Sequence, residues 1–354
     1  MRALTDVSLA PLTTLRLGGR AARLVEVDDD DELRGVVAAA DGKGEPLFVL
    51  GGGSNLVVAD EGFAGIVVRL RTRGVRVALD GTKVVLDAAA GEEWDALVSR
   101  CVAEGWSGVE SMAGIPGLVG AAPIQNIGAY GQEVRETIAN VTVLDRERDD
   151  FVEMESAACG FGYRTSILKG TTRFVVARVR FILSRGGEGV VRYAELARAL
   201  GCNEGDTAKL ADIRATVLAL RRAKGMVLDP ADPDSVSAGS FFVNPILDSE
   251  ALARLEQRAL ALGVVRAGES VPRFATGDAR WKTSAGWLIE RAGFVKGFGD
   301  GRAGVSRKHA LALVNRGGAT TAELLSLARA IRDGVRERFG VELTAEPVMI
   351  GCSL

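Results

Sequence analysis

Residues 111–132 carry no charged side chain over a length sufficient to cross a lipid bilayer. Pro116, Pro123 and five glycines interrupt this stretch, and such residues disfavour a membrane helix. An uncharged, glycine-rich main chain can instead lie flat against a large planar cofactor. A buried loop without a ligand is the alternative, but long structureless loops in compact domains are usually functional. We therefore expect this stretch to line a cofactor site.

A second glycine-rich segment, residues 50–56, has the sequence Leu-Gly-Gly-Gly-Ser-Asn-Leu and follows a β-rich run. Its glycines leave successive N–H groups unobstructed, which suits a pyrophosphate, and two polar side chains add donors. An ordinary tight loop is the alternative. The residues concerned are Gly51, Gly52, Gly53, Ser54 and Asn55.

Composition restricts the class of protein. The 354 residues are 47% hydrophobic and 25% charged, which excludes a disordered chain and allows more than one domain. The net charge of −2, without a basic block, disfavours a nucleic-acid partner. The four cysteines lie far apart and there is one histidine, so we expect neither a disulfide framework nor a metal site.

Residues 1–19 lack the apolar core of a secretory signal, so we expect a cytoplasmic protein without membrane insertion.

Strand and helix patterns alternate in the first half of the chain and predict a mixed α+β domain. Alternating or β-rich runs predict strands at residues 22–27, 46–51, 66–71, 138–144, 151–154 and 174–183, and a hairpin at 75–87 with its turn at Asp80-Gly81. Amphipathic runs predict helices at residues 31–40, 92–103, 193–200 and 208–224.

Charged and turn-forming residues at 229–234 indicate a domain boundary. Beyond it the patterns predict strands at residues 240–247 and 341–351, and helices at 249–262, 285–292 and 321–339. Thr320 and Glu323 form a capping box for the last helix, and Gly340 ends it.

One dinucleotide-binding string is rejected by its context. Residues 299–304 match G-x-G-x-x-G, and Glu323 lies near the distance expected of a ribose-binding acid. However, the string follows a predicted helix rather than a strand, and it opens no helix. Glu323 is already accounted for by the capping box.

Four further polar residues are candidates with plain alternatives. Arg164 could clamp a carboxylate with its planar guanidinium, although from the residues alone a surface ion pair is the favoured interpretation. Ser240 and Asn244 lie among apolar neighbours, as on an ordinary edge strand. Glu346 could simply face solvent.

Taken together, these segments resemble the UDP-N-acetylenolpyruvoylglucosamine reductase family over residues 13–351. The matching motifs are Gly-Gly-Gly-Ser-Asn, Ile-Pro-Gly with Pro-Ile-Gln-Asn-Ile-Gly-Ala-Tyr-Gly, Tyr-Arg-x-Ser, Gly-Ser-Phe-Phe-x-Asn-Pro and Ala-Gly-Trp-Leu-Ile-Glu. One such motif is a weak signal, whereas five in the family's order are a strong one.

The resemblance implies an α+β protein with a vanillyl-alcohol-oxidase-like (PCMH-like) FAD-binding fold. Two subdomains, residues 1–72 and 73–220, would hold FAD non-covalently, and residues 221–340 would form an α+β substrate-binding domain. Residues 341–354 would pack back onto the first subdomain. An insert near residues 186–206 would cover the substrate.

The resemblance also implies roles for individual residues. Ser240 would be the proton donor, and Arg164 and Glu346 would hold the enolpyruvyl carboxylate region. Glu342 stays an alternative to Glu346, because the register of the tail is ambiguous. Arg291 stands beside a position where the family usually has glutamine, and no role is carried over to it.

Binding residues follow from the same resemblance. Tyr193, Lys224 and Asn244 would contact the UDP-sugar and its phosphates, and Arg221 and Arg222 are further cations for a locally basic cleft. The residues implied to bind FAD are Gly51, Gly52, Gly53, Ser54, Asn55, Ile115, Pro116, Gly117, Gly120, Ala121, Ala122 and Tyr130.

The activity implied is the NADPH-dependent, FAD-mediated reduction of enolpyruvyl-UDP-N-acetylglucosamine to UDP-N-acetylmuramate. This step belongs to peptidoglycan precursor synthesis and thereby to cell-wall biogenesis, cell shape and cell division. We expect a monomer whose partner is this small-molecule substrate. Two alternatives remain open: another non-covalent FAD oxidoreductase of the same fold, and a nucleotide-sugar-binding protein without redox activity.

Overall fold

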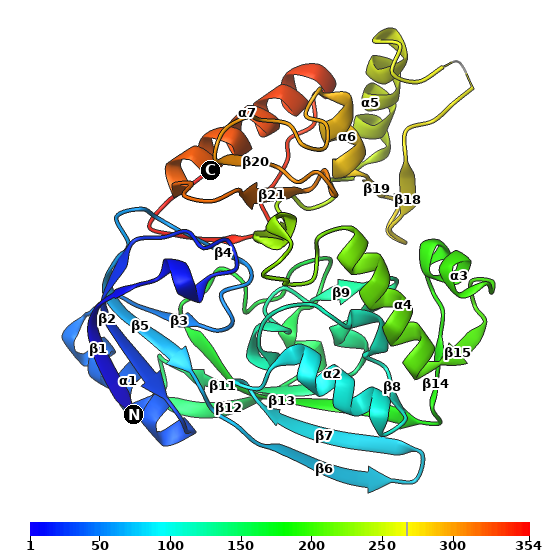
Figure 1. The fold of residues 1–354 in the computed structure, drawn as a ribbon. Helices are drawn as coiled ribbons and strands as arrows, with labels where there is room; N and C mark the ends of the chain where they lie inside the picture. Colours follow the sequence, from blue (N-terminus) through cyan, green and yellow to red (C-terminus); the bar gives the residue numbers. More distant parts are fainter. Residues whose placement is uncertain (267) are drawn as a thin grey trace. The chain divides into compact units, whose positions relative to one another are not determined.

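The computed structural model describes residues 1–266 and 268–354 and divides into two compact units (Figure 1). Unit 1 comprises Met1–Ser8, Arg20–Ser54 and Phe63–Leu228, and unit 2 comprises Leu9–Gly19, Asn55–Gly62 and Asp229–Leu354. The long C-terminal part of unit 2 thus begins at Asp229, where the sequence shows charged and turn-forming residues. The division into residues 1–72, 73–220 and 221–340 stays a prediction.

The first sheet of unit 1 has the order β1 (Arg2–Ser8), β2 (Arg20–Val27), β5 (Phe63–Leu70), β3 (Leu47–Leu50). Strand β1 is antiparallel to β2, whereas β2, β5 and β3 run parallel. Helix α1 (Asp30–Lys43) connects β2 to β3 and buries Leu33, Val37 and Ala40, which recur at helical spacing. Asp29 caps this helix by accepting a hydrogen bond from the N–H of Glu32.

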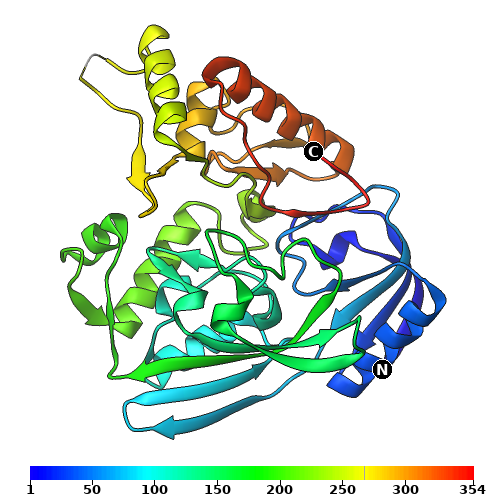
Figure 2. The same cartoon turned by 180° about the vertical axis from the view of Figure 1, so that it is seen from behind.

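The second sheet of unit 1 is antiparallel, with the order β12 (Asp150–Glu155), β11 (Ile138–Asp145), β13 (Phe174–Arg185), β7 (Lys83–Ala89), β6 (Val75–Asp80). The short strand β8 (Trp106–Ser107) also pairs with β13. The β6–β7 hairpin, cyan in Figures 1 and 2, forms one edge of the sheet. Gly81 takes a φ of +58° in its turn, which confirms the hairpin predicted from Asp80-Gly81.

Three helices and a small sheet complete unit 1. Helix α2 (Trp94–Ala103) contacts α4 (Leu210–Ala223), which in turn contacts α3 (Ala194–Leu200). Strand β14 (Glu188–Val190) precedes α3 in the sequence and strand β15 (Thr207–Lys209) follows it, and these two strands pair with each other. The pairing corrects the predicted start of the helix at residue 208, because Ala208 and Lys209 belong to β15 and α4 begins at Leu210.

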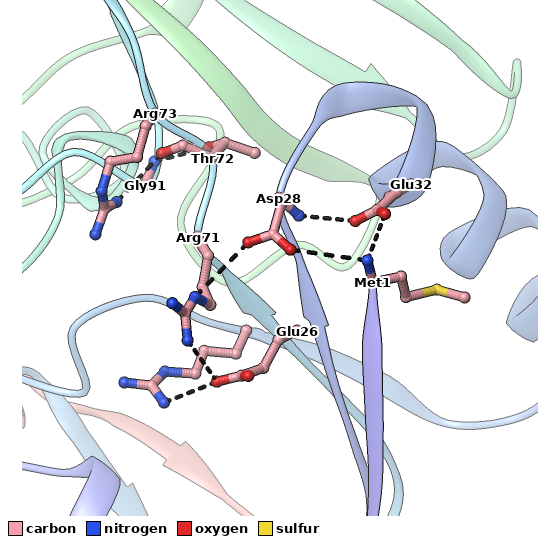
Figure 3. A network of polar contacts seen from close by, with 9 residues as sticks. Met1, Glu26, Asp28, Glu32, Arg71, Thr72, Arg73 and Gly91 are labelled. Carbon is pink, nitrogen blue, oxygen red and sulfur yellow. Dashed lines mark hydrogen bonds and ion pairs between the residues drawn. The ribbon is translucent and has the colours of Figure 1, made fainter.

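A network of polar contacts lies where the first sheet leads into the second (Figure 3). The buried carboxylate of Glu26 accepts hydrogen bonds from Arg69 at 3.0 Å and from Arg71 at 3.4 Å. The hydroxyl of the next residue, Thr72, accepts the N–H of Gly91 at 3.0 Å. A Cβ on Gly91 would lie 2.4 Å from the Thr72 carbonyl oxygen, so only glycine fits at this crossing.

Unit 2 combines three small sheets with three helices. The sheets are β16 (Ser237–Ser240), β21 (Ala312–Asn315), β20 (Ala303–Val305); β17 (Ile246–Leu247), β19 (Trp281–Thr283), β18 (Arg273–Ala275); and the parallel pair β4 (Leu56–Val58) and β22 (Val348–Ile350). The helices are α5 (Ser249–Ala261), α6 (Ala285–Arg291) and α7 (Thr321–Phe339), as predicted to within one residue at each end. The capping box of Thr320 and Glu323 and the left-handed Gly340 are confirmed.

Residues 55–62 belong to unit 2 because they hold the N-terminus of α7. The Asp60 carboxylate accepts the N–H of Thr321 at 2.8 Å and of Ala322 at 2.9 Å. The Thr321 hydroxyl donates to the Val58 carbonyl at 2.6 Å. These bonds satisfy N–H groups that a helix leaves unpaired at its start.

Two predicted strands of unit 2 are wrong in extent. Residues 240–247 do not form one strand, because β16 ends at Ser240 and β17 begins at Ile246. The Asn244 side chain between them accepts the N–H of Ala285, and Pro245 has no N–H to donate to a ladder. The terminal strand is limited to Val348–Ile350, because Val341 and Leu343 pack into the core before it without a ladder.

The rejected G-x-G-x-x-G string leads into strand β20 and opens no helix, as expected. Its loop closes around Arg316, whose guanidinium donates to the carbonyls of Gly297 and Phe298. A Cβ on Gly304 would lie 2.2 Å from the Arg316 Cζ. This glycine therefore makes room for a side chain of the protein itself.

Candidate functional site

The two predicted glycine-rich loops contact each other in unit 1. A Cβ on Gly52 would lie 2.6 Å from the Cα of Gly117, and a Cβ on Gly117 would lie 2.8 Å from the Ser54 Oγ. Gly53 and Gly117 have φ values of +63° and +126°, which side chains rarely tolerate. The main chains of the two loops therefore pack directly against each other, with no room for a side chain at Gly52 or Gly117.

The second loop is held from behind by the segment between β7 and α2. Gly120 donates its N–H to the Ala90 carbonyl at 2.9 Å, and a Cβ on Gly120 would lie 2.5 Å from the Ala90 Cβ. The Trp94 N–H donates to the Gly117 carbonyl at 3.1 Å. Such a fixed, uncharged main chain without room for side chains fits a flat dinucleotide cofactor.

Asn55 is separated from the other residues of its motif. It falls in unit 2, where its side-chain amide donates to the Glu346 carbonyl at 3.3 Å. The predicted role of Asn55 as a cofactor donor is untested, but one of its amide hydrogens has this main-chain partner. Ile115, Pro116 and Ala121 are half-buried in unit 1, and Ala122 is buried.

Arg164 is fixed against the glycine-rich stretch. Its guanidinium donates to the Gly128 carbonyl at 2.6 Å and to the Asn126 carbonyl at 3.4 Å. Arg164 itself has a φ of +54°, an unfavourable value for a bulky residue. Such strain is typical of functional sites, where the surroundings hold a side chain in a required place. Arg164 is thus held in place by the main chain of the glycine-rich stretch, and its role in a site stays a prediction.

Asn126 organises this region, and its importance was not predicted from the sequence. It is fully buried with a φ of +47°. Its amide nitrogen donates to the Glu133 carboxylate and to the Gly162 carbonyl, both at 2.9 Å, and its amide oxygen accepts the N–H of Arg135 at 3.1 Å. Glu133 belongs to β10 (Gln132–Glu133), which pairs with β9 (Gly128–Ala129); Arg135 lies in the turn that follows β10, and Gly162 in the loop before Arg164. The available signal in the sequence was an asparagine, a residue that tolerates a positive φ, within the glycine-rich stretch.

Tyr130, Tyr193 and Lys224 lie together, although they are distant in sequence. The two tyrosine rings pack edge to face with centroids 5.7 Å apart, and the Lys224 ammonium lies 5.6 Å from the Tyr130 ring centroid. Burial raises the pKa of Tyr130 to about 12, and it also raises the pKa of Tyr193. Both phenols are therefore neutral donors at physiological pH.

Arg221 and Arg222, named together as candidate cations, differ in their environment. Arg222 is exposed, whereas Arg221 is buried and donates to the carbonyls of Met226 at 2.9 Å and Gly114 at 3.4 Å. Burial lowers the pKa of Arg221 to about 10, so the side chain stays charged at neutral pH. Arg221 thereby holds the main chain at the start of the Gly114–Gly117 loop.

Unit 2 brings Ser240 and Glu346 onto neighbouring segments. Ser240 ends β16, and the carbonyl of the next residue, Phe241, accepts the N–H of Glu346 at 2.9 Å. Phe241 and Phe242 are buried and pack edge to face, which anchors this segment. Asn244 follows at the N-terminus of α6, where its amide oxygen accepts the N–H of Ala285 at 2.9 Å.

Glu342 has different surroundings from Glu346. Its side chain is 55% exposed and lies 3.7 Å from Arg332 and 3.8 Å from Arg336 of α7. Glu346 is half-buried beside Phe241. Arg291, at the end of α6, is exposed.

The described residues also bear on metal sites and membrane spans. Across residues 1–266 and 268–354, no cluster of three or more His, Cys, Asp and Glu side chains could hold a metal ion. Among the helices of the described residues, none has the length and apolar character needed to cross a membrane.

Comparison with known proteins agrees with this arrangement. A family model described as an FAD-binding domain matches residues 21–153, and a model of the UDP-N-acetylenolpyruvoylglucosamine reductase C-terminal domain matches residues 230–350. The chain is 56% identical to the UDP-N-acetylenolpyruvoylglucosamine reductase of Thermobifida fusca, over 99% of this chain and 98% of that protein. It is 52% identical to the reductase of Streptomyces coelicolor, over 99% and 91% of the two chains.

A solved structure shows the same fold. The crystal structure of UDP-N-acetylenolpyruvylglucosamine reductase from Thermus caldophilus is 27% identical, with a TM-score of 0.65, and the match covers 99% of this chain and 98% of that one. These similarities confirm the expected family, the expected FAD-binding fold and FAD as the cofactor. The chain therefore belongs to the UDP-N-acetylenolpyruvoylglucosamine reductase family and is a flavin-dependent oxidoreductase.

Proposed function

We propose that this chain reduces the enolpyruvyl ether of UDP-N-acetylglucosamine to UDP-N-acetylmuramate, with NADPH as the hydride donor. The observation that carries the proposal is the close packing of the Gly52 and Gly117 main chains, which brings the two glycine-rich loops predicted to hold FAD against each other. The family of the chain supplies the substrate class. When bound, the flavin supplies the hydride-transfer chemistry between the two substrates.

Arg164 is proposed to stabilise the charge that develops on the substrate. Hydride addition to the terminal vinyl carbon places negative charge on the adjacent carbon and its carboxylate. A guanidinium already fixed by two carbonyls needs little reorganisation to meet that charge, so it stabilises the transition state more than the ground state. Glu346, rather than the exposed Glu342, is proposed to act in this region, because its main chain is bonded beside Ser240.

Ser240 is proposed to protonate the carbon next to the carboxylate. A serine hydroxyl is a weak acid, so this role requires a strongly basic enolate as its partner. Gly239, with a φ of +74°, and the pairing of Ser240 with Ala312 set the direction of the chain at this point. The main chain therefore positions the Ser240 hydroxyl at the end of β16.

Lys224, Tyr193 and Asn244 are proposed to bind the UDP-sugar. The Lys224 ammonium suits a phosphate as a compact charge, and the neutral Tyr193 phenol can donate a hydrogen bond. The Asn244 amide oxygen already accepts the N–H of Ala285, so the amide nitrogen is the group that would donate to a ligand. We further propose that the protein acts as a monomer in the cytoplasm, without a nucleic-acid partner or membrane insertion.

Anaerobic half-reactions test the proposal. The purified protein should be yellow, NADPH should bleach it without the sugar substrate, and enolpyruvyl-UDP-N-acetylglucosamine should then restore the colour and yield UDP-N-acetylmuramate. A flavin that only oxygen or another acceptor reoxidises would favour another oxidoreductase of the same fold. A colourless protein that takes up no added FAD would favour a nucleotide-sugar-binding protein.

A further inference from the structure

The proposed phosphate-binding lysine is already paired with a carboxylate from the insert. The Lys224 ammonium lies 2.6 Å from the Glu195 carboxylate, and the two side chains are 34% and 35% exposed. Lys224 is the C-cap of α4, whereas Glu195 lies in the first turn of α3. Both groups are open enough to solvent for an incoming ligand to reach them.

The same insert also contributes the tyrosine. Tyr193 and Glu195 are two residues apart at the start of α3, and they contact Tyr130 and Lys224 respectively. The chain leading into α3 is held close to the glycine-rich stretch, because a Cβ on Gly131 would lie 2.6 Å from the Arg192 carbonyl oxygen. The insert is therefore held against the rest of unit 1 by both an aromatic and an ionic contact.

A diphosphate and the Glu195 carboxylate compete for the same ammonium. Lysine is a point charge, and its attraction to one anion weakens when a second anion already neutralises it. A bound diphosphate would also be repelled by a carboxylate that stayed beside Lys224. Since the UDP-sugar substrate must bind and the UDP-sugar product must leave in each cycle of the proposed reaction, an internal counter-ion would favour product release.

We propose that Glu195 is the internal counter-ion of Lys224, which a nucleoside diphosphate displaces, so that Glu195 sets the affinity for these ligands. This inference rests on the proposed function, because it takes Lys224 to be the diphosphate-binding cation. Glu195 acts through Lys224 and is a positioning residue. The direction of its effect distinguishes it from a structural support: its removal should tighten binding, whereas loss of a support would weaken it.

The test compares Glu195→Gln with the native holoenzyme by calorimetric titration of UDP and of uridine. The variant should bind UDP roughly two- to five-fold more tightly, the scale of a partly exposed ion pair, and uridine with unchanged affinity, because uridine carries no charge. Glu204→Gln removes the same charge from an exposed position of the insert and should leave both affinities unchanged. KM for the enolpyruvyl substrate should fall in Glu195→Gln, with flavin content and melting temperature retained.

The outcomes separate this inference from the proposed function. If the native enzyme turns over the enolpyruvyl substrate but Glu195→Gln binds UDP equally or more weakly, the counter-ion role is wrong and the function stands. Equal tightening in Glu204→Gln would also contradict it, since the effect would then come from overall charge. If the native holoenzyme neither binds UDP nor turns over this substrate, the proposed function fails and the inference fails with it.

Discussion

The Asp95 carboxylate accepts the N–H of Gly114 at 2.7 Å and so connects α2 to the start of the second glycine-rich loop. Its other oxygen accepts a hydrogen bond from Arg214 of α4 at 2.9 Å. Gly114 is buried and has a φ of +70°, so its N–H has little access to water. Asp95 thus fixes the loop from one side, while Arg221 donates to the Gly114 carbonyl from the other.

Asp95→Ala is expected to weaken FAD binding without unfolding the protein. The variant leaves the Gly114 N–H unpaired, and a buried unpaired N–H costs about 1–3 kcal/mol, or roughly a 5- to 150-fold rise in the dissociation constant if the loop bears the full cost. Fluorescence titration of the apoprotein with FAD measures this. Asp95→Asn, which keeps an acceptor, should lose less affinity; an Asp95→Ala protein with native affinity would contradict the proposed support.

Gly52→Ala is expected to abolish FAD binding. The added methyl group would meet the Gly117 Cα at 2.6 Å, where main chain and not a flexible side chain must move. Flavin content after purification measures the effect. Gly35→Ala is the matched control, because nothing lies within 4 Å of that site in α1 and alanine favours a helix by about 1 kcal/mol, so this variant should be slightly more stable and fully yellow.

Ser240→Ala is expected to affect only the second half-reaction. Removal of the hydroxyl leaves the glycine-rich loops of unit 1 untouched and takes away only the proposed proton donor of the second half-reaction, so FAD content and reduction by NADPH should stay normal. Reoxidation by the enolpyruvyl substrate should slow by about 10²- to 10⁴-fold, the contribution of a general acid. Stopped-flow absorbance separates the two steps, and unchanged reoxidation would remove Ser240 from the mechanism.

The free energy of unfolding is expected to fall at alkaline pH because of the ionisation of the Cys101 thiol. Burial raises the pKa of this thiol from 9.0 to about 12, so the folded protein keeps its proton where the unfolded chain loses it. Between about pH 9 and pH 12 the folded state binds more protons, and the free energy of unfolding therefore decreases as pH rises. Below pH 9 Cys101 should contribute no pH dependence.

Denaturant unfolding at several pH values measures this effect. Cys101→Ala should have a shallower alkaline decline than the native protein, whatever its stability at neutral pH. Cys202→Ala is the control, because Cys202 is only half-buried and should leave the decline unchanged. A native slope in Cys101→Ala would show that another group is responsible.

The predictions that succeeded depend on residues close together in sequence. Thr320, Glu323 and Gly340 mark both ends of α7 through hydrogen bonds within a turn of the helix. The alternation along residues 174–183 identified β13 because one face of the strand is buried. Capping hydrogen bonds and the periodicity of buried side chains involve residues that are neighbours in the sequence. These elements can therefore be predicted without the rest of the fold.

The predictions that failed depend on distant partners. Residues 240–247 have the composition of a single strand, but the Asn244 side chain is bonded to the start of α6, 41 positions along the chain. Val341 and Leu343 pack into the core, Ala345 forms an isolated bridge with Phe242, and only Val348–Ile350 pair with β4. The role of Asn126 as a hub likewise depends on partners in two other segments.

The sequence by itself determined the family, the glycine-rich loops suited to FAD and the identity of the candidate residues, because motif order, missing side chains and short-range periodicity are properties of the linear chain. Only the tertiary structure decided that Gly52 lies against Gly117, that Asp60 caps α7 and that Glu195 neutralises Lys224. The Lys224–Glu195 pair joins residues 29 positions apart, and the Thr321–Asp60 pair joins residues 261 positions apart. The free energy of these contacts depends on which surfaces the folded chain brings together, and a local sequence pattern does not contain that information.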